Sequence, residues 1–183
     1  MVTFKDFPDF KPNLTPKQVL RMGSFGGTYF RDIQSSVTGK KHSGKSAIKS
    51  FPKDWLKGIN LEKKVLSQDY DKDVNTYKVK CGSSLESWEK SNWIIKQDPY
   101  GWFQWYCHFY MGRRTKDDQR QIDRWLKITG PKGRFRRTLM NKIIKAGKDY
   151  NDKSISPVIR QVLQHWGYKL SKRDLEKYKK EKK

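Results

Sequence analysis

Arginine is concentrated in one stretch of this chain, directly after a stretch of aromatic residues. Residues 100–110 include seven aromatic side chains, and residues 113–137 hold seven of the chain's eleven arginines. Residues 113–148 carry 13 Lys and Arg side chains against three Asp. A guanidinium group is planar and donates paired hydrogen bonds, which suits phosphate better than an ammonium group does. The pattern therefore predicts a phosphate-binding face, with a merely solvated charged surface as the alternative.

The whole chain is strongly basic, because its 183 residues include 41 Lys and Arg and 19 Asp and Glu, for a formal charge of +22. Such a balance predicts a polyanionic partner, and we expect nucleic acid, DNA before structured RNA. The side chains expected to contact it are Arg31, Arg113, Arg114, Arg120, Arg124, Lys132, Arg134, Arg137, Lys145 and Arg160.

Several groups that can donate or accept protons lie near these arginines in the sequence. They are Tyr29, Asp98, Asp117, Asp118 and His165. Acidic groups beside a basic groove are typical of a metal-dependent nuclease, which would need Mg²⁺, and an aromatic pocket with one carboxylate is typical of a base-modifying enzyme. No motif selects either, so an enzyme acting on nucleic acid stays an alternative to simple binding. A structural subunit of a ribonucleoprotein assembly is a second alternative.

Two motifs that would indicate other chemistry lack their context. Residues 39–46 match the phosphate-loop pattern G-x-x-x-x-G-K-[ST], but no buried strand precedes them and Pro52 stops any long helix after them. We therefore interpret them as a basic turn. The two cysteines and three histidines lack zinc-site spacing, so we expect neither a metal site nor a cofactor.

The aromatic stretch predicts the central element of the fold. Asp98 followed by Pro99 suits a helix start, and Trp102, Trp105 and Tyr106 continue at helical spacing, so we expect a buried helix over residues 99–112. Stacking of some of these rings on unpaired bases is the functional alternative.

Amphipathic patterns predict helices over residues 116–128, 133–146 and 157–166, packed around the central helix. On the first, Asp118 falls on the inner side, and we expect Arg136 of the second to pair with it, because an unpaired buried charge is costly. A further helix over residues 84–93 places Leu85, Trp88 and Trp93 on its inner face.

The expected fold class is mainly α (α+β), with a small N-terminal β-hairpin formed by residues 29–33 and 36–38. We expect an N-terminal arm over residues 1–22, one nucleic-acid-binding domain over residues 23–170, and a basic C-terminal helix or tail over residues 171–183. Glycines 26 and 27 are expected to permit a close backbone approach.

The sequence contains no secretory apolar segment and no apolar run of about 18 residues, so we expect neither export nor a membrane partner. Two cysteines form no disulfide framework, which favours a reducing intracellular compartment. Together with the charge, this predicts a nuclear or nucleic-acid-associated location and a place in a larger nucleoprotein assembly.

Five blocks of the sequence carry a family resemblance: GSFGGTYFR (residues 23–31), DPYGWFQWYCHFYMGRR (98–114), DDQRQIDRW (117–125), GPKGRFR (130–136) and ISPVIRQVLQHWGY (155–168). They resemble blocks of a family of uncharacterised hypothetical proteins of eukaryotes and large DNA viruses. The resemblance implies one domain across residues 23–170 and adds no catalytic residue, because it carries no activity.

Overall fold

The computed structural model describes residues 2–182 and is mainly helical, with one small two-stranded sheet. The mainly α fold class with a β-hairpin is thereby confirmed. The α-helices are α1 (Pro16–Met22), α2 (Gly44–Ala47), α3 (Lys53–Leu56), α4 (Leu61–Lys64), α5 (Leu85–Lys90), α6 (Trp102–Tyr110), α7 (Asp118–Thr129), α8 (Arg134–Ala146), α9 (Pro157–His165) and α10 (Lys172–Glu181). Two 3-10 turns, η1 (Phe25–Gly27) and η2 (Lys72–Val74), complete the helical elements.

The hairpin lies a few residues later in the chain than expected. Strand β1 (Ile33–Gln34) pairs antiparallel with β2 (Lys41–His42), with Ile33 opposite His42. Residues 36–38, expected as the second strand, instead form the turn, which is closed by hydrogen bonds from the backbone of Ser35 to that of Lys40 and from Gly39 to Ser35. Gly39 has a φ of 69° and accommodates this turn without a side chain to strain it.

Helix α6 is the central element, as its aromatic composition predicts. Every residue from Trp102 to Cys107 is buried, and so is Phe109. The expectation that the helix begins at Pro99 is wrong, because Gly101, with a φ of 91°, precedes the first helical residue. The free backbone N–H groups of Phe103 and Gln104 donate to the hydroxyl of Tyr29, at 2.8 and 3.2 Å, so a side chain distant in sequence satisfies this helix end.

The larger hydrophobic core surrounds α6 and includes the N-terminal segment. The Phe10 ring is fully buried and contacts α6 rings edge-on, among them Trp102 and Tyr106, with centroid distances of 6.1 and 5.7 Å. Leu14 and the α1 residues Val19 and Leu20 join the same core. The segment expected as an arm thus contributes to the interior, as each buried aromatic ring removes roughly 150–250 Å² from water.

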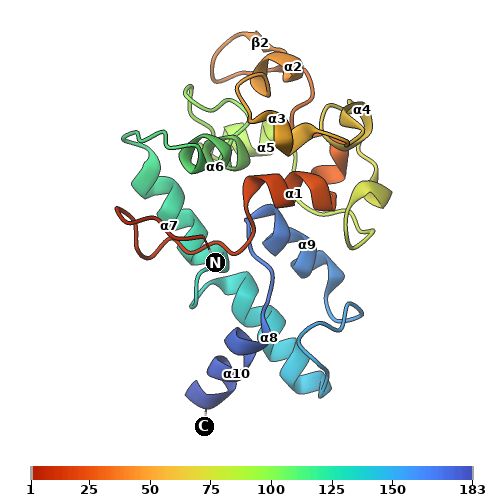
Figure 1. Cartoon of the computed structure of the whole chain (residues 1–183), viewed down its shortest axis with the longest axis vertical. Coiled ribbons are helices and arrows are strands. Elements are labelled where there is room, and N and C mark those ends of the chain that lie inside the picture. Colours follow the sequence, from red (N-terminus) through yellow and green to blue (C-terminus); the bar gives the residue numbers. More distant parts are fainter. Residues whose placement is uncertain (1, 183) are drawn as a thin grey trace.

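A second, smaller core lies among α8, α9 and α10, which occupy the lower half of Figure 1. Its buried residues are Leu139, Met140, Ile143, Leu163, Tyr168, Leu170, Leu175 and Tyr178. Residues 172–181 of the expected basic tail form α10 and supply Leu175 and Tyr178, whereas residue 183 lies outside the described chain. The two cores follow one another along the long axis of the molecule, with β2 near one end and α10 at the other (Figure 1).

The glycine-rich segment before β1 does permit a close backbone approach. A Cβ on Gly27, whose φ is 80°, would lie 2.0 Å from the carbonyl oxygen of Lys63. A Cβ on Gly23 would lie equally close to the carbonyl oxygen of Val74. These glycines let η1 pack directly against backbone of α4 and of the turn at η2.

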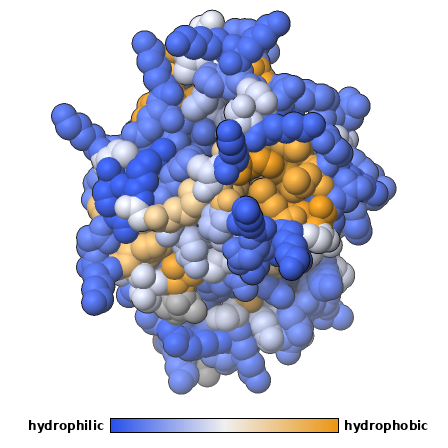
Figure 2. Space-filling view, turned by 45° about the horizontal axis from the view of Figure 1, so that its top comes forward, coloured by the Kyte–Doolittle hydropathy of each residue, from blue (hydrophilic) through white to orange (hydrophobic). Residues whose placement is uncertain are grey.

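Most of the surface in Figure 2 is hydrophilic, with apolar groups gathered mainly in one patch between hydrophilic projections. This agrees with the chain's basic composition. Among residues 2–182, no helix combines the length and the apolar character that a bilayer crossing requires.

Candidate nucleic-acid interface

The two arginines directly after α6 form ion pairs with other residues of the protein. Arg113 donates two hydrogen bonds to the fully buried carboxylate of Asp98, at 2.9 and 2.6 Å. Asp98 precedes α6 and Arg113 follows it, so this ion pair joins the two ends of the central helical segment. Arg113 therefore has its charge compensated within the fold.

Arg114 is held by the N-terminal segment. Its Nε lies 2.5 Å from the carboxylate of Asp6, and its guanidinium lies 3.8 Å from the centroid of the Phe109 ring. A further hydrogen bond runs from its Nη1 to the Phe109 carbonyl oxygen, at 2.8 Å. The contacts fix residues 4–10 beside α6.

The two arginines of α7 differ in whether a carboxylate neutralises their charge. Arg120 pairs with Asp117, one turn earlier, at 2.5 and 3.0 Å. Arg124 forms no ion pair with any carboxylate in residues 2–182, and its guanidinium lies between the rings of Trp93 and Trp166. Burial and the charge of Arg120 lower the Arg124 pKa to about 10, so the group stays charged at neutral pH.

Arg31 and Arg160 also serve the fold. Arg160 is buried and donates to the carbonyl oxygens of Ile155 and Tyr150, at 2.9 and 3.0 Å. Arg31 is half-buried and donates to the Thr28 carbonyl oxygen at 3.0 Å. Burial lowers the pKa of both guanidinium groups.

The remaining basic candidates lie in or near α8 and are exposed. Lys132, Arg134, Arg137 and Lys145 form no ion pair with a carboxylate among the described residues. The sequence of α8, RFRRTLMNKIIKA, contains no acidic residue, and its opposite face carries Leu139, Met140 and Ile143 into the second core. The α8 outer face, which we define as Arg134, Arg137, Asn141 and Lys145, is therefore cationic and uncompensated.

The expected pair between Asp118 and Arg136 is wrong. The buried Asp118 carboxylate accepts hydrogen bonds from Trp105 Nε1 at 2.9 Å and from the backbone N–H of Thr115 at 2.8 Å, and a third from the Thr115 hydroxyl. Arg136 instead pairs with Asp174 of α10 at 2.9 Å and lies over the Tyr168 ring. Neutral donors thus satisfy Asp118, while Arg136 fastens α10 to α8.

The other acid and base candidates also have structural partners. The Tyr29 hydroxyl donates to the Tyr100 carbonyl oxygen at 2.7 Å, and burial raises its pKa far above the usual value. Asp98 and Asp117 are paired with arginines, as described above. His165 Nε2 accepts from the backbone N–H of Phe25 at 2.8 Å, and burial lowers the His165 pKa to about 3. These five groups do not converge on a common site.

Within residues 2–182, no three His, Cys, Asp or Glu side chains are grouped so that they could hold a metal ion. The phosphate-loop match also lacks the required geometry. Helix α2 has only four residues, and the backbone N–H of Gly44 donates to the carboxylate of Asp32 at 2.8 Å. An acidic side chain at that position disfavours phosphate.

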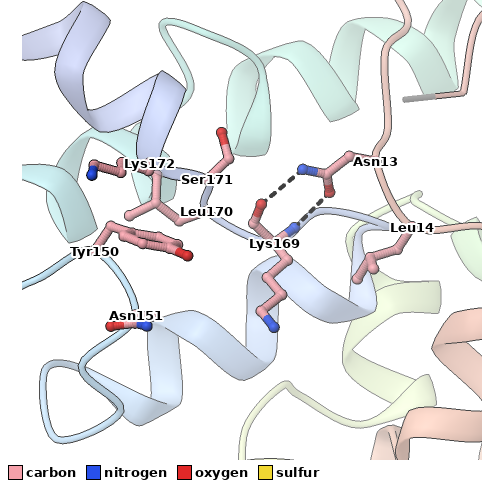
Figure 3. Close-up of a pocket in the computed structure, with 8 residues that line it drawn as sticks. All are labelled: Asn13, Leu14, Tyr150, Asn151, Lys169, Leu170, Ser171 and Lys172. Atoms are coloured by element: carbon pink, nitrogen blue, oxygen red, sulfur yellow. Dashed lines mark hydrogen bonds between the residues drawn. The ribbon is translucent and has the colours of Figure 1, made fainter.

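A shallow hollow of about 380 Å³ lies beside the start of α10 (Figure 3). Asn13 bridges to the backbone of Lys169 through two hydrogen bonds of 2.8 Å, which join the N-terminal segment to the segment between α9 and α10. The lining residues include Lys169, Lys172 and Tyr150 and no carboxylate. The hollow therefore adds two lysines to the basic surface, which the sequence patterns did not single out.

Trp93 was placed wrongly by the sequence patterns. Helix α5 ends at Lys90 and Asn92 has a φ of 57°, so Trp93 leaves the helical spacing that grouped it with Leu85 and Trp88. It is 44% exposed instead of facing inward. The rings of α6, by contrast, are buried except for Tyr110, so they offer no faces for stacking on bases.

Comparison of the chain with models of known protein families, with curated proteins and with solved structures finds no match.

Proposed function

We propose that this protein binds nucleic acid, with DNA as the first candidate and structured RNA as the second, and that the α8 outer face contacts the phosphates. The observation that carries the proposal is the uncompensated charge of this face. Eight other arginines are matched with carboxylates, carbonyl oxygens or rings, whereas Arg134 and Arg137 have exposed guanidinium groups and no carboxylate within salt-bridge distance among residues 2–182. Arg134 lies over the ring of its neighbour Phe135, 5.5 Å from the centroid, and Arg173 of α10 is likewise exposed without a carboxylate partner in the described chain. Free cationic groups on one rigid helix are the usual means of neutralising phosphate charge.

Asn141 supports contact with phosphates over reading of bases. Its side-chain oxygen accepts hydrogen bonds from Tyr178 at 2.9 Å and from Lys182 at 2.7 Å. An asparagine that reads adenine uses its oxygen and its amide nitrogen together. Because the oxygen of Asn141 is occupied, only its N–H₂ group remains to donate, which suits a phosphate oxygen. We therefore expect little sequence specificity from this face.

Binding tests the proposal directly. Fluorescence anisotropy would compare labelled duplex DNA, single-stranded DNA and hairpin RNA with the wild type and with the double variant R134A/R137A. The matched control, K40A/K41A, removes the same charge from the exposed hairpin, near the opposite end of the molecule (Figure 1). We expect R134A/R137A to weaken binding about tenfold and the control to have a small effect.

Equal losses in the two double variants would contradict the proposal, because they would mean that overall charge and not the α8 outer face governs binding. Absence of binding by the wild type would contradict it outright. The same samples, incubated with Mg²⁺ and analysed for cleavage or base release, test the enzymatic alternative. The nuclear location and a larger nucleoprotein assembly remain predictions that follow from the proposed binding.

A further inference from the structure

Trp93 is the most exposed of the tryptophans, yet its position is well defined. It is 44% exposed, whereas the other six are buried or half-buried. Its carbonyl oxygen accepts hydrogen bonds from Nη1 of Arg120 at 3.3 Å and from Nη1 of Arg124 at 3.4 Å. The Arg124 guanidinium also lies 5.3 Å from the centroid of the Trp93 ring. Two arginines of α7 thus hold the backbone of Trp93, and one of them also lies against its ring.

The ring is the last member of a stack that begins in the core. Trp102 of α6 stacks on Trp166, with centroids 4.4 Å apart and planes 26° from parallel. Trp166 is covered by Arg124, 5.4 Å from its ring centroid, and Arg124 is covered by Trp93. A hydrogen bond of 2.9 Å from Trp125 Nε1 to the Trp166 carbonyl oxygen further fixes this stack. No aromatic ring among residues 2–182 stacks on Trp93 itself.

The charge beneath the ring favours an anionic ligand. Arg124 is partly buried and lacks a carboxylate partner in the described chain, and the exposed Lys96 lies three residues after Trp93. Arg120 also reaches the Trp93 carbonyl oxygen, but its charge is paired with Asp117. A planar ligand on Trp93 would extend the stack, and a phosphate attached to it would meet this positive charge. A nucleotide combines both properties. Because the stack is already ordered, little side-chain entropy would be lost on binding.

We propose that Trp93 is a stacking platform for an unpaired nucleobase, so that the protein engages a single-stranded segment of nucleic acid. This inference rests on the proposed function, since the α8 outer face supplies the general attraction to phosphate. Bases within a duplex are stacked on both faces, and only a splayed or single-stranded base offers a free face to a surface ring. The Trp93 platform therefore gives the protein a preference for single-stranded over duplex nucleic acid. The α8 outer face sets its overall affinity for either.

The alternative role for Trp93 is a cover that shields Arg124 from water. A cover alone would contribute to stability and leave nucleic-acid affinity unchanged. The two roles are separated by measuring affinity for single-stranded and duplex ligands together with thermal stability. Trp93 lies in an exposed loop, so the W93A variant should retain the cooperative unfolding of the wild type.

The experiment compares oligo(dT) of 20 nucleotides with a hairpin duplex of similar charge, using the wild type, W93A, W93F and the control V158A. Val158 is a similarly exposed apolar residue on α9. We expect W93A to weaken binding of oligo(dT) about tenfold, a typical effect of losing one base–aromatic stack, and to change duplex binding less than about twofold. W93F should recover most of the loss, and V158A should match the wild type.

Equal affinities of W93A and the wild type for oligo(dT), or equal losses on both ligands, would overturn the inference while leaving the proposed function intact. The reverse result is also distinguishable. If W93A lowers oligo(dT) affinity but R134A/R137A changes neither ligand's affinity, the stacking platform is supported and the α8 outer face is not. A wild type that binds neither ligand overturns both proposals.

Discussion

His165 shows how a single buried residue can couple stability to pH. Its Nε2 accepts hydrogen bonds from the backbone N–H of Phe25 and from Nε2 of Gln161, at 2.8 and 3.0 Å. The ring proton of the neutral side chain therefore lies on Nδ1, which faces the Cys81 sulfur at 3.7 Å. Both ring nitrogens of His165 have a suitable hydrogen-bond partner only while the ring is neutral. A general-base role would need an accessible, titrating imidazole, which this environment does not provide.

Stability should fall as the pH falls below about 6.5. Burial lowers the native-state His165 pKa to about 3, whereas an unfolded histidine titrates near 6.5. Between these values the unfolded state binds one more proton, so acid favours unfolding, by about 1.4 kcal/mol for each pH unit well below 6.5. Urea unfolding from pH 7 to pH 5 should show a shallower pH dependence in H165N than in the wild type. Identical slopes would contradict the assignment of His165 as the buried neutral group.

At the scale of elements, ion pairs between distant segments fasten the helices. Asp98 and Arg113 join the ends of the α6 segment, Asp6 and Arg114 hold the N-terminal segment, and Asp174 and Arg136 fasten α10. The first of these contains a fully buried carboxylate, and so its loss should cost the most.

The R113A variant should be about 3 kcal/mol less stable than the wild type, because it leaves the Asp98 carboxylate buried without its cation. The matched control is K17A, which removes the exposed pair with Asp54. Exposed pairs contribute roughly 0–1 kcal/mol, so K17A should unfold at nearly the wild-type urea midpoint. Similar midpoints for R113A and K17A would show that the buried pair does not stabilise α6.

The helices were largely predictable because local rules define them. The apolar spacing of residues 116–128, 133–146 and 157–166 matches α7, α8 and α9 to within about two residues, and Gly147, with a φ of 62°, ends α8 in the left-handed conformation typical of helix ends. The start of α6 was misplaced, because the carboxylate of Asp98 is directed to Arg113 and does not cap the helix. The role of Asp98 therefore depends on Arg113, fifteen positions later in the chain.

The roles of individual arginines could not be read from spacing. A helical pattern indicates which way a side chain faces, but it does not identify its partner. The partner of Arg114 is Asp6, 108 residues away, and that of Arg136 is Asp174. Sequence reasoning therefore found the basic region but overestimated how many of its arginines are free. The Trp93 stack was missed because its four members, Trp93, Trp102, Arg124 and Trp166, come from four separate segments of the chain.

At the scale of the whole molecule, the two ends differ in character. The end that contains the second core carries the α8 outer face and the lysines beside the hollow at α10 (Figures 1 and 3). The larger core around α6 supports the stack that ends at Trp93. We therefore propose that a rigid aromatic scaffold carries a phosphate-binding helix and a separate stacking platform.

The salt dependence of binding tests this account most directly. The logarithm of affinity for duplex DNA should fall linearly with the logarithm of salt concentration, with a slope of about −0.9 for each phosphate neutralised. R134A/R137A should therefore have a slope shallower than the wild type by about 2, whereas K40A/K41A should keep the wild-type slope. An unchanged slope in R134A/R137A, or an equal change in both variants, would contradict phosphate binding by the α8 outer face.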